Sequence, residues 1–275
     1  MANSTDIRVL TDMDNALYHA GSSHVSRSAA SRYFGADGGR SQRFVEVFGG
    51  SLFSGSVAAS LGTAVDTAVS AMIGGVEWRS VIHVPPADVC ATDGSRRGKK
   101  YTDWKSSLLT SAIEVSAVDE QKIHSMVQSL QEHKIARDLI ALSTHSQYSV
   151  FWTDENGHQR KARADGVTAT EWWDLKTTSS EWRDIGHSFR KYFYDWQAAW
   201  YSDAAEAAGC PPFVFRFVCV QTFPPFDVRV FTLPKRTLAR ARSEIDETLD
   251  AMRTRRESGV YVDEQYHEAV ELQIG

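Results

Sequence analysis

Residues 146–177 read SQYSVFWTDENGHQRKARADGVTATEWWDLKT. This stretch predicts three consecutive strands, and these strands decide the fold of the chain. Within residues 146–153, Tyr148, Val150 and Trp152 occupy every second position, which is the alternation expected of a strand. Residues 154–157, Asp-Glu-Asn-Gly, predict a hairpin turn with glycine at the position that favours a positive φ, and residues 158–167 return. Residues 171–177 are predicted to form a third strand.

Two of these strands each carry an acidic residue, Asp165 and Asp174, and Lys176 follows two residues after Asp174. Successive side chains of a strand point to opposite faces, so Asp174 and Lys176 are expected on the same face. Carboxylates suit Mg²⁺ or Mn²⁺, which lowers the pKa of a bound water. Lys176 can orient or deprotonate that water or stabilise the leaving charge. The pattern predicts phosphodiester hydrolysis.

A surface ion pair is the simpler interpretation of Asp174 and Lys176, because charged side chains are usually exposed. Trp172, Trp173 and Leu175 flank the pair with large apolar groups. This context predicts a partly buried strand, where charges are costly unless they are paired or used. The flanking residues therefore favour the catalytic interpretation.

Helices are predicted before and after these strands, over residues 26–34, 60–72, 116–142, 188–208 and 234–257, with further strands over 76–84, 213–222 and 226–233. This order is typical of a mixed α/β or α+β fold with one central sheet. We expect residues 1–275 to form a single domain, with residues 1–60 as a helical extension packed on the core.

The composition excludes several classes of protein. The 275 residues include 30 Lys+Arg and 35 Asp+Glu, and 42% are hydrophobic, which is typical of a globular chain rather than a disordered one. No apolar run approaches the ~20 residues of a membrane span, and the amino end has no secretory signal, so we expect a cytoplasmic protein without membrane contact. Three cysteines without CxxC spacing argue against a disulfide framework or a cysteine metal site.

Further motifs accompany the strands and share their order with a known family. They are Tyr18-His19, VSRSA at 25–29, LGTAVD at 61–66, Arg163-Ala164-Asp165, WDLKTT at 173–178 and YDWQAAWY at 194–201. Together they resemble the PD-(D/E)XK nuclease superfamily, specifically the exonuclease VIII (RecE-like) family, related to lambda-type exonuclease. The resemblance implies a restriction-endonuclease-like core, with a central mixed sheet flanked by helices.

The resemblance also implies roles for individual residues. It assigns Asp165, Asp174 and the carbonyl of Leu175 to the metal, and Lys176 to the nucleophilic water. Asp66 stands where the family usually has His, and we expect it to be a third ligand, because a carboxylate suits a hard cation. Gln147 replaces a Glu of the family and supplies no negative charge for a second metal.

A predicted helix carries Gln197 with Tyr194 and Tyr201 on one face. In the resembling family this helix packs beside the active site and contacts the substrate strand, so Gln197 is a candidate catalytic residue and the two tyrosines are candidate DNA contacts. The alternative for this helix is an aromatic core stripe, which is our interpretation of its other aromatic residues.

Basic residues supply further candidate DNA contacts, although a solvated charged face is the alternative for each one. The candidates are Arg160, Lys161 and Arg163 on the hairpin, and Arg97, Lys99 and Lys100 in a flexible basic segment. The acidic net charge of −5 argues against coating nucleic acid by bulk charge.

The residues predict metal-dependent phosphodiester hydrolysis. The resemblance extends this to a Mg²⁺-dependent exodeoxyribonuclease, with Mn²⁺ able to substitute, that hydrolyses duplex DNA from its ends in the 5′ to 3′ direction during recombination or repair. A homo-oligomer and a single-strand annealing protein are the partners that the resemblance implies. Two alternatives stay open: a catalytically weakened DNA-end binding module, suggested by Gln147 and Asp66, and an endonuclease of the same superfamily. No Gly-rich phosphate loop follows a predicted strand, which argues against a cofactor-transferring enzyme.

Overall fold

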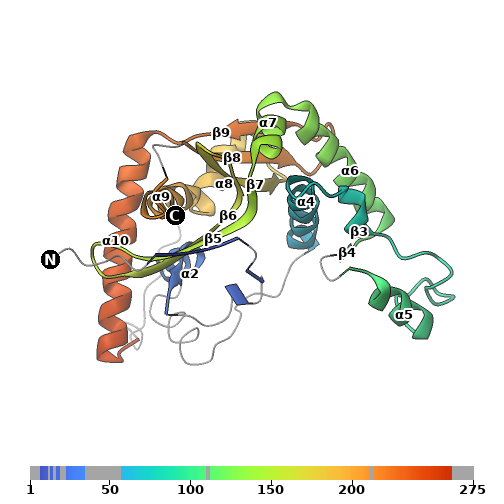
Figure 1. Cartoon of the computed structure of the whole chain (residues 1–275), viewed down its shortest axis with the longest axis horizontal. Coiled ribbons are helices and arrows are strands. Elements are labelled where there is room, and N and C mark those ends of the chain that lie inside the picture. Colours follow the sequence, from blue (N-terminus) through green and yellow to red (C-terminus); the bar gives the residue numbers. More distant parts are fainter. Residues whose placement is uncertain are drawn as a thin grey trace, which may run out of the picture.

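A computed structural model shows a mixed β-sheet with helices on both faces (Figure 1), which confirms the predicted fold class. The structure describes residues 7–11, 13–14, 17–18, 23–34, 57–109, 112–210 and 214–261. Among the described residues, no helix is both long and apolar enough to cross a membrane.

The main sheet is built around the predicted hairpin. Its strands follow the order β1 (Ile7–Leu10), β5 (His145–Thr153), β6 (Gln159–Val167), β7 (Glu171–Thr178), β8 (Val214–Gln221) and β9 (Val228–Phe231), and β2 (Val25–Ser26) pairs with β6. β7 and β8 run parallel, whereas the other neighbours along this order are antiparallel. Strands β5, β6 and β7 agree with the predicted ranges to within one residue.

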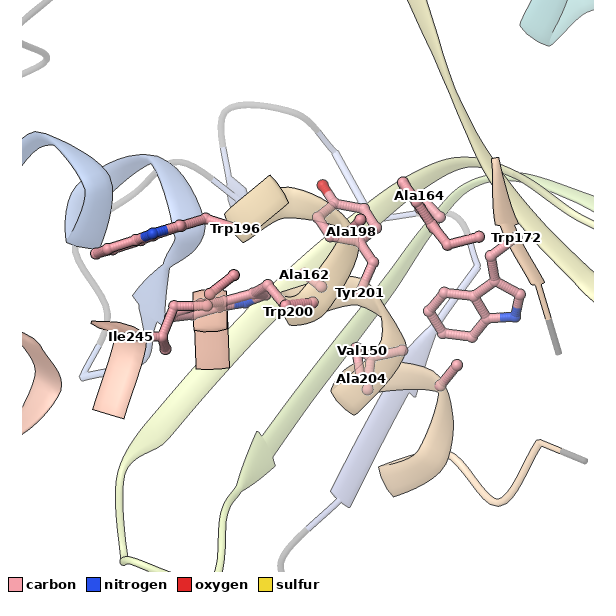
Figure 2. Close-up of a cluster of buried hydrophobic side chains, with 14 of the residues drawn as sticks. Val150, Ala162, Ala164, Trp172, Trp196, Ala198, Trp200, Tyr201, Ala204 and Ile245 are labelled. Carbon is pink, nitrogen blue, oxygen red and sulfur yellow. The ribbon is translucent and has the colours of Figure 1, made fainter. Parts of the chain in front are cut away.

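One face of the sheet packs against α2 (Arg27–Arg32), α8 (Ile185–Lys191), α9 (Tyr194–Ala207) and α10 (Lys235–Ser258). Figure 2 shows Trp200 and Tyr201 of α9 near Ala162 and Ala164 of β6. Trp196 and Trp200 are fully buried there, and Ala162 and Ala164 on β6 leave room for the helix. This close contact holds α9 directly against β6.

The other face packs against α4 (Val57–Ile73), α6 (Ala117–Glu132) and α7 (Lys134–Leu142). Gly62 lets α4 approach the end of β7, because a Cβ at Gly62 would lie 3.0 Å from Oγ1 of Thr177. Farther out lie η2 (Trp78–Ser80), β3 (Ile82–His83), α5 (Lys99–Ser107) and β4 (Ile113–Glu114). A further short helix, η3 (Trp182–Asp184), directly precedes α8 in the chain. Figure 1 shows α5 at the opposite end of the molecule from α10.

Several predicted elements differ in the structure. Residues 76–84 were predicted as a strand, but they form η2 and the two-residue strand β3. The predicted helix over 116–142 is divided at His133, and the one over 188–208 is divided before Tyr194, where Phe193 has φ 54°. Within residues 1–60, β1 and β2 join the main sheet rather than forming only a helical extension, and residues 35–56 lie outside the described part.

A substitution at Gly166 tests how closely β6 and β7 must approach. Gly166 pairs with Trp173, and a Cβ at Gly166 would overlap the Trp173 indole, which is fully buried. We expect Gly166→Ala to lower the free energy of unfolding by about 1–3 kcal/mol through overpacking. The measurement is urea unfolding followed by tryptophan fluorescence.

Gly186→Ala is the matched control, because it adds a methyl group in α8 where a Cβ meets nothing within 4 Å. Helix propensity predicts a neutral or slightly stabilising effect at Gly186. Equal stability of the two variants would contradict the packing argument for Gly166.

Candidate active site

The candidate site lies where β6 and β7 separate. The two strands pair only at Gly166 with Trp173 and at Val167 with Trp172, whereas β7 pairs with β8 over residues 171–178. Beyond the last β6–β7 pair, the backbone N–H of Leu175 donates to Oδ2 of Asp165 at 2.7 Å. The carboxylate of Asp165 therefore takes the hydrogen bond that a neighbouring strand would otherwise supply.

Asp174 lies at the centre of the site, with only 3% of its surface exposed. Its Oδ1 accepts a hydrogen bond of 2.5 Å from Nε2 of Gln197, a buried residue of α9. Its Oδ2 forms an ion pair with Nζ of Lys176. As the strand alternation predicts, Asp174 and Lys176 share one face of β7, and that face is the one covered by α9.

Asp66 reaches the same site from α4, one helical turn after Gly62. Nε2 of Gln147 donates to Oδ2 of Asp66 at 3.0 Å, whereas Oδ1 of Asp66 is buried without a hydrogen-bond partner among the described residues. Gln147 has φ 52°, an uncommon conformation for a residue other than glycine. The β5–β6 pairing is interrupted at Gln147, which lies between the pairs formed by Ser146 and Tyr148.

Two carboxyl groups of this site, Asp66 and Asp165, have raised pKa values. Burial and then the charge of Asp174 raise the pKa of Asp66 from 3.8 to about 6, against the opposing effects of Lys176, the Gln147 hydrogen bond and Arg163. Burial, followed by the charges of Asp174 and Asp66, raises the pKa of Asp165 well above its usual value. Such mutual repulsion is typical of acidic groups that share a small volume.

Lys176 is held as an ammonium ion in this structure. Burial acts to lower the pKa of Lys176, but the negative charges nearby, with that of Asp174 the largest, outweigh burial and raise the pKa. The Lys176 ammonium also lies 5.1 Å from the ring centroid of Tyr194. A charged Lys176 can orient a water molecule or neutralise negative charge, whereas it cannot accept a proton from that water.

The donor set fits a hard divalent cation. Asp66, Asp165 and Asp174 supply oxygen atoms, and the unpartnered Oδ1 of Asp66 and the mutual repulsion both mark a deficit of positive charge. In the described part of the chain, however, no three His, Cys, Asp or Glu side chains are already arranged around one point. The carboxylates instead contact Lys176, Gln197 and Gln147. A bound cation would replace some of these contacts.

Arg27 is a site residue that the sequence analysis did not nominate. It begins α2, which is capped by the Ser26 side chain, and its Nη2 lies 3.4 Å from Oε1 of Gln197. Its Nη1 donates to the carbonyl oxygen of Tyr192 at 3.3 Å. Its position inside the VSRSA motif was the available signal, but the motif alone does not show that α2 lies against α9.

The three basic residues of the hairpin are structural rather than exposed phosphate contacts, which corrects the expectation for Arg160, Lys161 and Arg163. Each is less than 9% exposed. The guanidinium of Arg160 lies over the rings of both Trp152 and Trp200 and pairs with Asp203 at 3.0 Å.

The other two hairpin cations fix the amino-terminal segment. Nζ of Lys161 donates to the carbonyl oxygen of Tyr18 at 2.6 Å, and the guanidinium of Arg163 bonds Oγ of Ser149 at 2.8 Å. Both cations also lie over the Tyr18 ring. These residues attach the chain around Tyr18 to β6.

The two candidate tyrosines of α9 differ in their surroundings. Tyr201 is buried, and its hydroxyl donates to the carbonyl oxygen of Arg163 at 2.6 Å, so the expectation of a DNA contact is corrected here too. Tyr194 lies beside Lys176 and lines a cavity.

The remaining candidate DNA contacts lie away from the acidic residues. Arg97 pairs with Asp93 at 2.6 Å on the surface, and Lys99 and Lys100 are exposed at the start of α5. Figure 1 shows α5, which begins with Lys99 and Lys100, beyond α4 and α6 and away from β7, the strand that carries Asp174.

Comparison with known proteins bears on the fold and the family of this chain. No curated protein matches the chain. A crystal structure of a protein from Eubacterium rectale, named as a candidate exonuclease, superposes with a TM-score of 0.64 at 13% sequence identity and covers 96% of both chains. At this identity the similarity shows the fold alone. A family model matches residues 89–261, so the chain belongs to the family described as PDDEXK-like domain of unknown function (DUF3799).

Proposed function

We propose that this protein is a metal-dependent exodeoxyribonuclease that hydrolyses phosphodiester bonds from the ends of duplex DNA, in the 5′ to 3′ direction. The observation that carries the proposal is the convergence of Asp174, Lys176 and Gln197 at the point where β6 and β7 separate. Membership of a PDDEXK-like family and a structural relative named as a candidate exonuclease support it.

Each residue of the site has a part in this hydrolysis. Asp66, Asp165 and Asp174, with the Leu175 carbonyl, would hold Mg²⁺ or Mn²⁺, which supplies Lewis-acid polarisation of the phosphate and a more acidic bound water. The ammonium of Lys176 orients the attacking water and offsets charge that builds on the phosphate oxygens. Gln197 fixes the carboxylate of Asp174, and Arg27 adds a second positive charge behind Gln197.

Several finer parts of the proposal rest on the RecE-like resemblance. They are a role in recombination or repair, a homo-oligomer and a single-strand annealing partner. The length of the chain supports a single nuclease-like domain over residues 1–275. The proposed DNA contacts are Tyr194, which lies beside Lys176, and the exposed residues Arg97, Lys99 and Lys100.

A DNA-end binding module is the second candidate function, and Gln147 favours it. Gln147 donates to Asp66 where a Glu would add a negative charge, so the site has one carboxylate fewer for a second metal. DNA affinity without any product that depends on Mg²⁺ or Mn²⁺ would select this candidate.

Removal of the ammonium group tests the catalytic role of Lys176. We expect Lys176→Ala to lower kcat for linear duplex DNA by about 10²–10³-fold, because a preorganised charge at the reacting phosphate is lost. Circular dichroism checks that the variant keeps the native fold. Lys134→Ala, which removes an exposed lysine paired with Asp138 on α7, is the control and should digest at the parental rate. Digestion by Lys176→Ala at that same rate would contradict the assignment.

The raised pKa of Asp66 predicts a dependence of stability on pH and metal. A carboxyl group with a higher pKa in the folded than in the unfolded state favours folding below pH about 4, and this contribution is lost as the pH rises to about 6. In chelator at pH 8, Asp66→Asn should therefore stabilise the protein by about 1–3 kcal/mol, and at pH 4 the gain should vanish.

Added Mn²⁺ should reverse this ranking, because only the wild type keeps all three carboxylates for the cation. Thermal unfolding in chelator and in Mn²⁺ measures both effects. If Mn²⁺ raised the melting temperature of Asp66→Asn as much as that of the wild type, Asp66 would not be a ligand.

Duplex DNA with distinguishable ends tests the mode of cleavage. We expect the 5′ label of linear DNA to be released before the 3′ label in Mg²⁺ or Mn²⁺, no release in chelator, and no cutting of covalently closed circles. Early release of the 3′ label would reverse the proposed polarity, and cleaved circles would select the endonuclease of the same superfamily.

A further inference from the structure

A cavity of about 270 Å³ opens beside Lys176, between the end of β7 and the helices α8 and α9. Hydroxyl side chains dominate its lining, and they are Thr177, Thr178, Ser179, Ser180, Ser188 and Thr222. Lys176 is the charged side chain of the described lining, which includes no carboxylate. Lysine and hydroxyl groups are common contacts to phosphate and sugar in nucleic-acid complexes.

Two tyrosines complete the cavity on the side of α8 and α9. Tyr192 is 49% exposed, and its ring lies 5.9 Å from that of Tyr194, with 31° between the ring planes. Between them, Phe193 adopts a left-handed conformation, which is costly for an aromatic residue. This conformation breaks the helix so that both tyrosines line the cavity, and an exposed aromatic ring can stack on a nucleobase.

Contacts with the surrounding elements fix the cavity in place. Arg27 bonds the carbonyl oxygen of Tyr192 and the side chain of Gln197, which joins the break between α8 and α9 to the acidic residues. Oγ of Ser180 and Oγ of Ser188 lie 2.8 Å apart. The shape of the cavity is therefore held before any ligand enters.

We infer that this cavity is the subsite for a single nucleotide of the DNA strand, adjacent to the phosphodiester bond that is cut. The phosphate lies towards Lys176, the sugar lies against the hydroxyl groups, and the base stacks on Tyr192. The volume of about 270 Å³ lies just below the ~300–1,000 Å³ of small-molecule sites, so the cavity is of a size for one nucleotide and not for a duplex. The inference rests on the proposed function for its place in the reaction.

Binding of deoxyadenosine 5′-monophosphate tests the inference without any cleavage. Isothermal titration calorimetry of the full chain in chelator should show one saturable site. Deoxyadenosine and inorganic phosphate should each bind more weakly, because each provides only part of the contacts. Absence of saturable binding of the monophosphate, or equal binding of phosphate alone, would overturn the nucleotide subsite.

Variants of Tyr192 identify the cavity as the place of binding. Tyr192→Ala should weaken the affinity at least about fivefold, whereas Tyr192→Phe, which keeps the ring, should stay within about twofold of the wild type. Leu142→Ala, an exposed apolar residue at the end of α7, is the control and should bind as the wild type does. Wild-type affinity in Tyr192→Ala would overturn the inference.

The inference and the proposed function can fail separately. A protein that degrades DNA in Mg²⁺ but binds no monophosphate would retain the nuclease assignment and lose the subsite. A protein that binds the monophosphate through Tyr192 but cleaves no DNA would lose the nuclease assignment and retain a nucleotide pocket beside Lys176.

Discussion

The separation of β6 from β7 is the constraint on which the rest of the site depends. Where Gly166 pairs with Trp173, the backbone groups of β6 and β7 hydrogen-bond to each other. Past that pair, the backbone N–H of Leu175 needs another acceptor. Asp165 supplies that acceptor, so one carboxylate both completes the backbone hydrogen bonding and faces Asp174 across the opening. The parallel pairing of β7 with β8 keeps the opposite edge of β7 fixed along its full length.

The site places buried carboxylates and one ammonium group close together. The negative charge of Asp174 adds to burial in raising the pKa of Asp66 and of Asp165. Gln197 donates a hydrogen bond to Asp174, and Lys176 forms an ion pair with it. The positive charge of Lys176 is in turn maintained by those carboxylates. Removal of one buried partner leaves another charge uncompensated, so the site acts as a unit.

Sequence reasoning predicted the elements whose pattern is local. The hairpin of β5 and β6 has regular alternation and an Asn-Gly turn, and the pairing of Asp174 with Lys176 on one face follows from strand geometry alone. The break at Phe193 was not predictable, because no Gly or Pro stands there and the cause lies in packing against other elements.

The buried cations of the hairpin were mistaken for surface residues for the same reason. A basic run such as Arg160 to Arg163 is usually solvated, and nothing in the sequence indicated that Tyr18 and two tryptophan rings would cover it. Arg27 was overlooked because its closeness to Gln197 depends on a contact between segments 170 residues apart.

The position of a bound cation tests the central claim most directly. Diffraction from crystals grown with Mn²⁺, measured at a wavelength where manganese scatters anomalously, would locate the ion independently of any assay. The account predicts an anomalous peak between Asp165 and Asp174, with Lys176 beside it. A peak elsewhere, with both carboxylates still held by Leu175 and Gln197, would contradict the account.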